Sequence, residues 1–320
     1  MMGSDQLDVN KLPIIDFRKG ELKEGSEEWI SLREQVYKAL EEYGCFEALL
    51  DGVPKEKLYD KLKQVYNLPN LDTKFTNSQT SSSSGYFKDN PLIPLYERMT
   101  IHHVLSPGVI QSFFSNIMLP DHGDSQFCDL VHGYAKGLSE FDEMIRKMIF
   151  AKLGIFEKYW DEHKNSTSSL LGMLHYRVPK DDETNVGLPA HTDKLITTIL
   201  SQHQIGVGGL QIMKKNGEWI DVEYSSPHSF IFLVSDILTA ITNGRLPCPY
   251  HRVNMGNTER YSIGFSSIAK QGYIIKVAEE LIDEHHPLLY KPFDALKFFQ
   301  YCLSRDHKDG APTLEGFCGV

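Results

Sequence analysis

The sequence lacks the features that mark several common classes of protein. Its five cysteines are scattered and none forms a CxxC pair, which argues against a thiolate zinc site and against a disulfide framework. No stretch approaches the ~18 apolar residues that a membrane helix needs. Residues 1–10 are polar and have no apolar stretch typical of a secretory signal. We therefore expect a cytoplasmic protein that does not bind membranes.

Positive charge is also scarce. The 320 residues include 33 Lys and Arg against 43 Asp and Glu, a formal net charge of −10. A broad basic surface for nucleic acid is therefore not expected. Hydrophobic residues make up 41% of the chain and charged residues 24%, which is the usual balance of a globular protein with a core. No heptad repeat is present, so we expect a monomer.

Helical patterns dominate the first half of the chain. Apolar residues recur there at spacings of three and four, which favours helices with one buried face. Ser26 is a suitable N-cap and Gly44 a suitable helix end. The predicted elements are a strand at 12–17, a helix from Ser26 to Gly44, a strand at 45–50, a helix from Pro54 to about Tyr66 and a long helix at 129–154.

A Ser-rich, low-complexity segment occupies residues 77–85. It has too little apolar surface to offset the entropy of ordering its chain. The segment is either a plain linker or a mobile lid over a pocket. The aromatic residues that follow at once, Tyr86 and Phe87, favour the lid.

The second half has short β-prone segments separated by turn signals such as Asn216-Gly217 and Asn243-Gly244. Strands are predicted at 172–177, 195–201, 209–213, 218–222, 229–234, 238–242, 251–254 and 261–268. Short strands with no helices between them fit an antiparallel jelly roll. We expect mainly β structure with α, in which a double-stranded β-helix (jelly-roll) core is flanked by N-terminal helices and a C-terminal helix.

The chain is expected to form one domain over residues 1–320. Its predicted parts are an N-terminal helical and β region at 1–127 with the Ser-rich lid at 77–85, a supporting helix at 128–154, the jelly-roll core at 171–275 and a C-terminal segment at 276–320.

A candidate metal site is formed by His191, Asp193 and His251. In an extended chain, residues i and i+2 point to the same face, so His191 and Asp193 can converge on one ion. His251 begins another predicted strand and can supply a third ligand. Two imidazoles and one carboxylate are the donor set of non-haem Fe(II) oxygenases, which leaves positions open for a co-substrate and O₂. Since the chain has 13 His and 43 acidic residues, the triplet alone is weak evidence.

A candidate anion site lies close by in the sequence. Arg260 and Ser262 share one face of the last predicted core strand, and a guanidinium fork binds a carboxylate bidentately. Tyr176, upstream of His191, can donate a phenolic hydrogen to the same anion. A diacid such as 2-oxoglutarate would chelate iron at one end and bind Arg260 at the other.

These elements, in this order, resemble the plant 2-oxoglutarate/Fe(II)-dependent dioxygenases of specialised metabolism. The similarity covers nearly the whole chain. Within that family, the two ends of the chain are similar to the enzymes that modify glucosinolates and to the steroidal-glycoalkaloid hydroxylases. The segments that carry the resemblance are 12–17, 39–46, 209–212, 217–222, 243–245, 251–253, 286–293 and 317–320.

The resemblance implies two sets of ligands. Fe(II) would be held by His191, Asp193 and His251. The distal carboxylate of 2-oxoglutarate would be held by Arg260, Ser262 and Tyr176. One departure is Leu174, where the family often has an Asn that aids 2-oxoglutarate binding.

The resemblance also implies the reaction. A small specialised metabolite would be hydroxylated, O- or N-demethylated or desaturated by O₂, with succinate and CO₂ as co-products and ascorbate as a reductant. The substrate is expected to be bulky and partly apolar. Its candidate contacts are Tyr86, Phe87, Tyr96, Lys194, Phe265, Ser266, Leu296 and Phe299.

Three alternatives remain open at this point. A related Fe(II) oxidase would use the same core without 2-oxoglutarate. A zinc hydrolase could also use two His and an Asp, although the Arg260–Ser262 pair has no role in it. A non-catalytic protein could bind a small molecule on the same fold.

Overall fold

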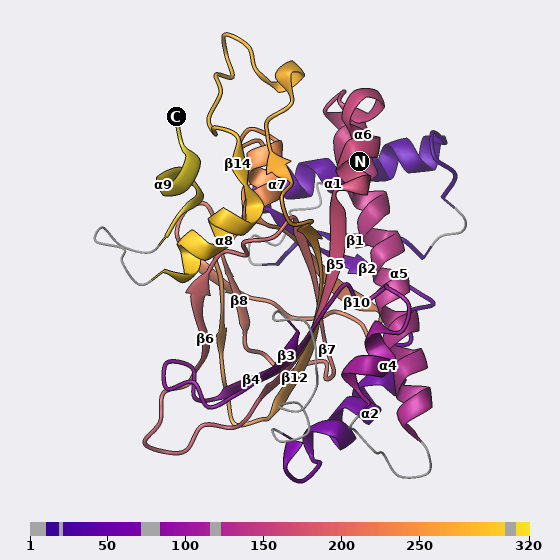
Figure 1. Ribbon diagram of the computed structural model, residues 1–320, viewed down its shortest axis with the longest axis vertical. Coiled ribbons are helices and arrows are strands. Elements are labelled where there is room, and N and C mark those ends of the chain that lie inside the picture. The colour runs from indigo at the N-terminus through magenta and orange to yellow at the C-terminus, as the bar shows by residue number, and fades with distance from the viewer. Residues whose placement is uncertain (1–10, 19–21, 72–83, 116–122, 305–311) are drawn as a thin grey trace, which may run out of the picture.

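The computed structural model describes residues 11–18, 22–71, 84–115, 123–304 and 312–320. Within these residues two β-sheets face each other, and the long helix α5 (Gly123–Lys152) lies along the outer side of the larger sheet (Figure 1). A third, small sheet pairs β13 (Ile274–Ile275) with β14 (Phe293–Asp294). The predicted jelly-roll core with flanking helices is confirmed.

The larger sheet has eight strands in the order β1-β2-β10-β7-β12-β5-β4-β3. Its neighbours are antiparallel except for β1 and β2, which are parallel. The strands are β1 (Ile14–Asp16), β2 (Cys45–Leu49), β3 (Gly85–Phe87), β4 (Tyr96–His102), β5 (Thr167–Tyr176), β7 (Thr197–Gln202), β10 (Ser229–Val234) and β12 (Arg260–Ala269).

The smaller sheet has four strands in the order β6-β11-β8-β9. They are β6 (Val186–His191), β11 (His251–Asn254), β8 (Leu210–Met213) and β9 (Trp219–Asp221). Strand β10 contributes side chains to two cores, because successive side chains along a strand point to opposite faces. Phe232 packs in the core on the helix side, and Leu233 packs in the core that includes Leu210 of the smaller sheet. We call the space between the two sheets the interior.

Helices cover the outer face of the larger sheet. An apolar stripe along α5, which includes Val131, Leu138 and Ile145, packs onto the sheet in the main core. In the described part of the chain, no helix has the length and apolar character needed to cross a bilayer. The other helices are α1 (Glu27–Tyr43), α2 (Lys55–Tyr66), α4 (Val109–Phe113), α6 (Phe156–Asn165), α7 (Asp236–Ile241), the 3₁₀ helix η2 (Glu279–Leu281), α8 (Ala295–Leu303) and α9 (Leu314–Cys318).

The two predicted ends of α1 are confirmed. The Ser26 hydroxyl accepts a hydrogen bond from the Trp29 N–H, and Gly44 ends the helix at a φ of 69°. Gly44 is also confined sterically, because a Cβ there would lie 2.2 Å from the Pro247 carbonyl oxygen. Helix α1 therefore turns directly into β2.

The strand predicted at 238–242 is wrong. Those residues belong largely to helix α7, so the core strands are not free of intervening helices as expected. All six residues of α7 are buried, and a short segment that is buried on every side carries no 3.6-residue periodicity. Strands β4 and β6 were not predicted, and α5 begins earlier than expected. Most of the predicted lid, residues 77–83, lies outside the described residues.

A buried carboxylate fastens α5 to the sheet. Asp142 is completely buried and accepts hydrogen bonds from Thr197 of β7 and from Ser267 of β12. It also accepts one from Arg146, one helical turn further on, at 2.8 Å. Arg146 in turn donates to the His163 ring of α6 at 2.8 Å. One carboxylate thus joins two helices and two strands.

We predict that Asp142→Ala destabilises the fold by about 3–5 kcal/mol, because Arg146 is left as an uncompensated buried charge. The free energy of unfolding is to be measured by urea denaturation followed by circular dichroism. Glu143→Ala is the matched control, since Glu143 is the next residue of α5 and pairs with lysines at the surface. Its effect should stay within about 0.5 kcal/mol. Equal losses in the two variants would contradict the assigned role of Asp142.

Candidate functional site

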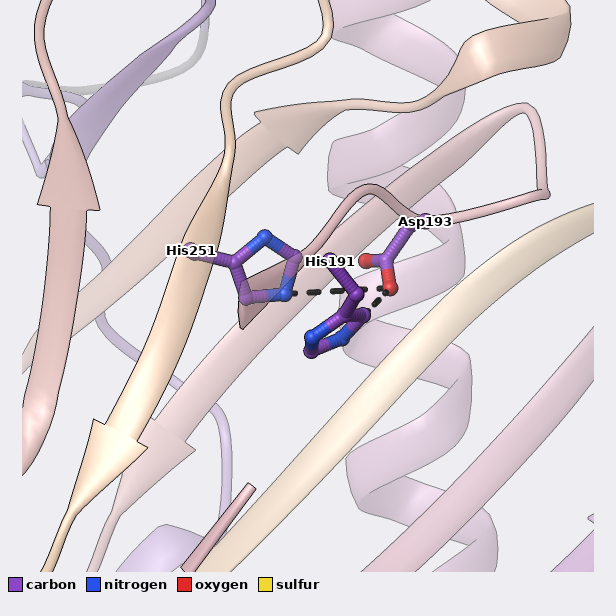
Figure 2. A group of neighbouring side chains, drawn as sticks. All are labelled: His191, Asp193 and His251. Atoms are coloured by element: carbon purple, nitrogen blue, oxygen red, sulfur yellow. Dashed lines mark ion pairs between the residues drawn. The ribbon is translucent and has the colours of Figure 1, made fainter. Parts of the chain in front are cut away.

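The pairing of two strands brings His191 and His251 together. Strands β6 and β11 are antiparallel, and these two residues are direct partners across them, with ring centroids 4.2 Å apart. Asp193 follows two residues after His191. Its Oδ1 lies 3.7 Å from Nε2 of His191 and 3.8 Å from Nε2 of His251. The three side chains converge, as Figure 2 shows.

Backbone carbonyls fix the orientation of both rings. Nδ1 of His191 lies 2.8 Å from the Pro189 oxygen, and Nδ1 of His251 lies 3.2 Å from the Pro249 oxygen. A carbonyl can only accept, so each Nδ1 carries the hydrogen and each Nε2 keeps its lone pair. The ligand atoms of the three residues lie within 4.8 Å of one another, so this group could hold a metal ion.

The charge states of the cluster also suit a cation. Burial, together with the neighbouring His251, lowers the pKa of His191 to about 4. His191 is therefore a neutral ligand at pH 7. Burial alone would raise the pKa of Asp193, but the two histidines, the Thr198 hydroxyl and Lys194 together hold it below its usual value. Asp193 is therefore an anion at pH 7.

The loop that carries Asp193 is braced by α7. Asp236, the first residue of that helix, donates its N–H to the Asp193 carbonyl at 2.9 Å. Its carboxylate accepts hydrogen bonds from Lys194 at 2.7 Å and from Thr192 at 3.1 Å. This carboxylate thus holds both neighbours of Asp193. Sequence reasoning missed this role of Asp236 because it predicted a strand where α7 lies.

A buried cation lies in the interior on β12. Arg260 is only 3% exposed. Its Nε donates to Oε1 of Gln202 at 3.3 Å, and its guanidinium carbon lies 5.3 Å from the centre of the Tyr176 ring, which is its direct partner on β5. Among the described residues, Arg260 forms no ion pair with a carboxylate. A buried guanidinium without a counter-charge is costly, so this position suits an anionic ligand.

Tyr176 and Ser262 lie beside Arg260, but their hydroxyls differ. Burial raises the pKa of Tyr176, so its phenol stays protonated and can donate. The Ser262 hydroxyl already donates to the Ser201 carbonyl at 2.7 Å. Gln202 is a further positioning residue, since its amide N–H group donates to the Gln204 and Val207 carbonyls and thereby turns its oxygen towards Arg260. Only the pairing of β7 with β12 reveals Gln202, so sequence reasoning missed it.

Two of the expected substrate contacts do not face the interior. Phe265 packs in the main core on the helix side of β12, because it alternates with the interior-facing Ser266. Tyr86 also packs against the main core, and its hydroxyl donates to Glu97. The expectation that these two rings line the substrate pocket is therefore corrected.

The other candidate contacts lie in different places. Tyr96 packs against Tyr176 in the interior, and Phe87 is a partner of β4 at the sheet edge. Lys194 is engaged by Asp236 and approaches helix α8, with its Nζ 5.9 Å from the centre of the Phe298 ring. Figure 1 shows α8 beside the end of β6. Two further candidates are exposed on α8, namely Leu296 and Phe299.

The chain is similar to known oxygenase sequences. Residues 167–267 match the model of the 2OG-Fe(II) oxygenase superfamily. The chain is 42% identical to a probable 2-oxoglutarate-dependent dioxygenase, AOP1 of Arabidopsis thaliana, over 91% of this chain and 97% of that protein. It is 29% identical to the 2-oxoglutarate-dependent dioxygenase AOP3 of the same plant, over 97% and 98% of the two chains.

Solved structures have the same fold. The rice dioxygenase for auxin oxidation superposes with a TM-score of 0.76 at 25% identity, covering 97% of this chain and all of that one. The corresponding Arabidopsis thaliana enzyme with bound 2-oxoglutarate superposes with a TM-score of 0.72 at 23% identity, covering 86% and 99%. The chain belongs to the 2-oxoglutarate/Fe(II) oxygenase superfamily and is an oxidoreductase that uses Fe(II) and 2-oxoglutarate.

Proposed function

We propose that His191, Asp193 and His251 hold the Fe(II), and that Arg260 and Tyr176, with Ser262 beside them, hold the distal carboxylate of 2-oxoglutarate. The enzyme oxidises a small, partly apolar specialised metabolite by hydroxylation, demethylation or desaturation. O₂ is the oxidant, and ascorbate keeps the iron reduced. The chain acts as a single catalytic domain and as a cytoplasmic monomer.

The observation that carries this proposal is the convergence of two Nε2 lone pairs and one carboxylate oxygen within 4.8 Å. Two imidazoles and one carboxylate with open positions suit non-haem Fe(II). Both rings are held through Nδ1 by backbone carbonyls, and such hydrogen bonds fix the tautomer and orientation of metal-binding histidines. The donor set therefore fits the metal that the family uses.

The buried Arg260 supports the assignment of the co-substrate site. Its guanidinium needs an anion, and a carboxylate matches its fork. Tyr176 supplies a second donor because its phenol is protonated. Gln202 holds Arg260 in place through Nε and leaves the other guanidinium N–H groups available. The Ser262 hydroxyl, whose hydrogen is bound to Ser201, contributes mainly by fixing β12 to β7.

The chemistry is divided between the cofactor and the chain. When bound, Fe(II) supplies the activation of O₂ that is coupled to conversion of 2-oxoglutarate to succinate and CO₂. The chain positions the reactants and keeps water out. Asp236 and Lys194 hold the loop of Asp193 in place, and Arg260 fixes the far end of the co-substrate.

We predict that His191→Ala, Asp193→Ala and His251→Ala each abolish stoichiometric Fe(II) binding and succinate formation, since each removes one of three ligands. Iron is to be measured by anaerobic titration with elemental analysis, and succinate by mass spectrometry. His228→Ala is the control, because His228 is exposed and pairs with Asp51 at 2.9 Å. Retained turnover in all three ligand variants would overturn the metal assignment.

Arg260→Gln should weaken 2-oxoglutarate binding by about 30-fold or more, since truncating one partner of a buried charge pair costs at least about 2 kcal/mol. The affinity of Arg260→Lys for 2-oxoglutarate should lie between those of Arg260→Gln and the wild type, because an ammonium keeps the charge but lacks the two parallel N–H donors of a guanidinium. Affinity is to be measured by anaerobic titration calorimetry of the metal-loaded protein. The control is Arg252→Gln, since Arg252 stacks on Trp219 at 4.1 Å, away from Arg260. Unchanged affinity in Arg260→Gln would remove Arg260 from the co-substrate site.

The reaction type is tested with a metabolite extract from the source tissue. The protein is incubated anaerobically with Fe(II), 2-oxoglutarate and the extract, and air is then admitted. Mass spectrometry should show one metabolite that gains an oxygen atom, loses a CH₂ unit or loses two hydrogens, with succinate formed in equal amount. A product formed without succinate would contradict the use of 2-oxoglutarate as co-substrate.

A further inference from the structure

A second arginine projects into the interior from a strand that the proposed iron and co-substrate sites do not use. Arg98 lies on β4, paired with Leu174 of β5 on one side and with Phe87 of β3 on the other. Leu174 packs into the interior cluster with Tyr96. Directly paired residues project from the same face of a sheet, so Arg98 projects into the interior as well.

The guanidinium of Arg98 has no carboxylate partner among the described residues. Its side chain is exposed, and its guanidinium carbon lies 5.7 Å from the centre of the Phe87 ring. Stacking on a ring leaves the N–H edges of a guanidinium available. The adjacent Glu97 does not neutralise it, since that carboxylate contacts His175 on the opposite face of the sheet.

The charge of Arg98 reaches the proposed active site. Burial raises the pKa of Tyr96, the Arg98 guanidinium opposes this change, and the charge of Asp193 adds to it. Arg98 and Asp193 therefore act on the same phenol from within the interior. By geometry, Arg98 lies two residues along β4 from Tyr96, which packs against Tyr176 in the interior.

Open space and an unsatisfied hydroxyl adjoin Arg98. Thr100, two residues along β4, is only 8% exposed, and its Oγ1 has no hydrogen-bond partner in the described part of the chain. Its direct partners on the two flanking strands are Gly85 and Gly172. Among the described residues, a Cβ built on Gly85 would meet nothing within 4 Å, and one on Gly172 would come no closer than 3.6 Å, to a Leu174 methyl. The sheet thus presents a strip with little side-chain cover beside the guanidinium.

Arg98 is separate from the proposed co-substrate anchor. Strand β5 lies between β4 and β12, so the two strands are about 10 Å apart across the sheet. Arg260 pairs with Tyr176 of β5, and Tyr176 pairs with Tyr96 of β4, so Tyr96 and not Arg98 lies in the same row as Arg260. Two cationic groups, Arg98 and Arg260, thus project into one interior. In the proposed function, one molecule of 2-oxoglutarate pairs with Arg260 and leaves Arg98 available.

We propose that Arg98 and Thr100 form a substrate subsite that binds an oxyanion, either a carboxylate or a sulfate, on the metabolite being oxidised. The guanidinium supplies a bidentate donor pair and the Thr100 hydroxyl a third donor. The glycine strip lets the body of the substrate lie against the sheet. The inference rests on the proposed function and specifies its substrate class as an anionic small molecule.

The test is anaerobic titration calorimetry of the protein loaded with Fe(II) and 2-oxoglutarate. The carboxylate pair of probes is indole-3-acetate and its neutral amide, and the sulfate pair is indoxyl sulfate and the neutral indoxyl acetate. In the wild type the anion of at least one pair should bind about tenfold or more tightly than its neutral partner. Arg98→Met should abolish that preference, Arg98→Lys should keep part of it, and Thr100→Val should reduce it.

Arg177→Met is the matched control. It removes the same charge from the end of β5, where Arg177 pairs with Glu183 instead of facing the interior, and the preference for the anion should remain. The proposal is overturned if neither anion is preferred by the wild type, or if Arg98→Met keeps the preference. It is also overturned if Arg98→Met weakens the binding of 2-oxoglutarate, since Arg98 would then belong to the co-substrate site. A failure of the proposed function would appear separately, as absence of 2-oxoglutarate binding to the wild-type protein.

Discussion

The antiparallel pairing of β6 with β11 is the constraint on which the site depends. It sets His191 directly opposite His251, and a shift of one residue would turn one ring to the other face of the sheet. The carbonyls of Pro189 and Pro249 then aim the two rings. Asp193 completes the group only because α7 holds its loop. Register, ring orientation and loop support act together on three side chains.

The larger sheet organises the rest of the interior. Strand β12 carries Arg260, its neighbour β5 carries Tyr176, and the next strand outward carries Arg98. The opposite faces of these strands pack in the main core on the helix side, where Asp142 fastens α5 to β7 and β12. The helix layer therefore acts on the site indirectly. It holds in place the strands whose other faces carry the charged groups.

Much of the fold and of the candidate site could be predicted from the sequence, because those features depend on local periodicity. Alternation along a strand places Arg260 and Ser262 on one face, and a cap at each end defines α1. Features that depend on pairing between distant strands could not be predicted. Gln202 and Arg98 gain their significance from neighbours on other strands. Phe265 was misplaced although alternation from Arg260 already puts it on the opposite face of β12. Helix α7 was not predicted because it is buried on all sides and so shows no helical periodicity in its sequence.

In the proposed co-substrate site, the buried guanidinium of Arg260 makes the stability of the folded protein depend on its anionic ligand. An unpaired charge in the interior destabilises the folded chain until an anionic ligand binds to it. Any ligand that binds only the folded form shifts the equilibrium away from unfolding, by about 2.7 kcal/mol at a hundred times its dissociation constant. If 2-oxoglutarate is that ligand, as proposed, the folded protein would resist unfolding better where the diacid is abundant than where it is scarce.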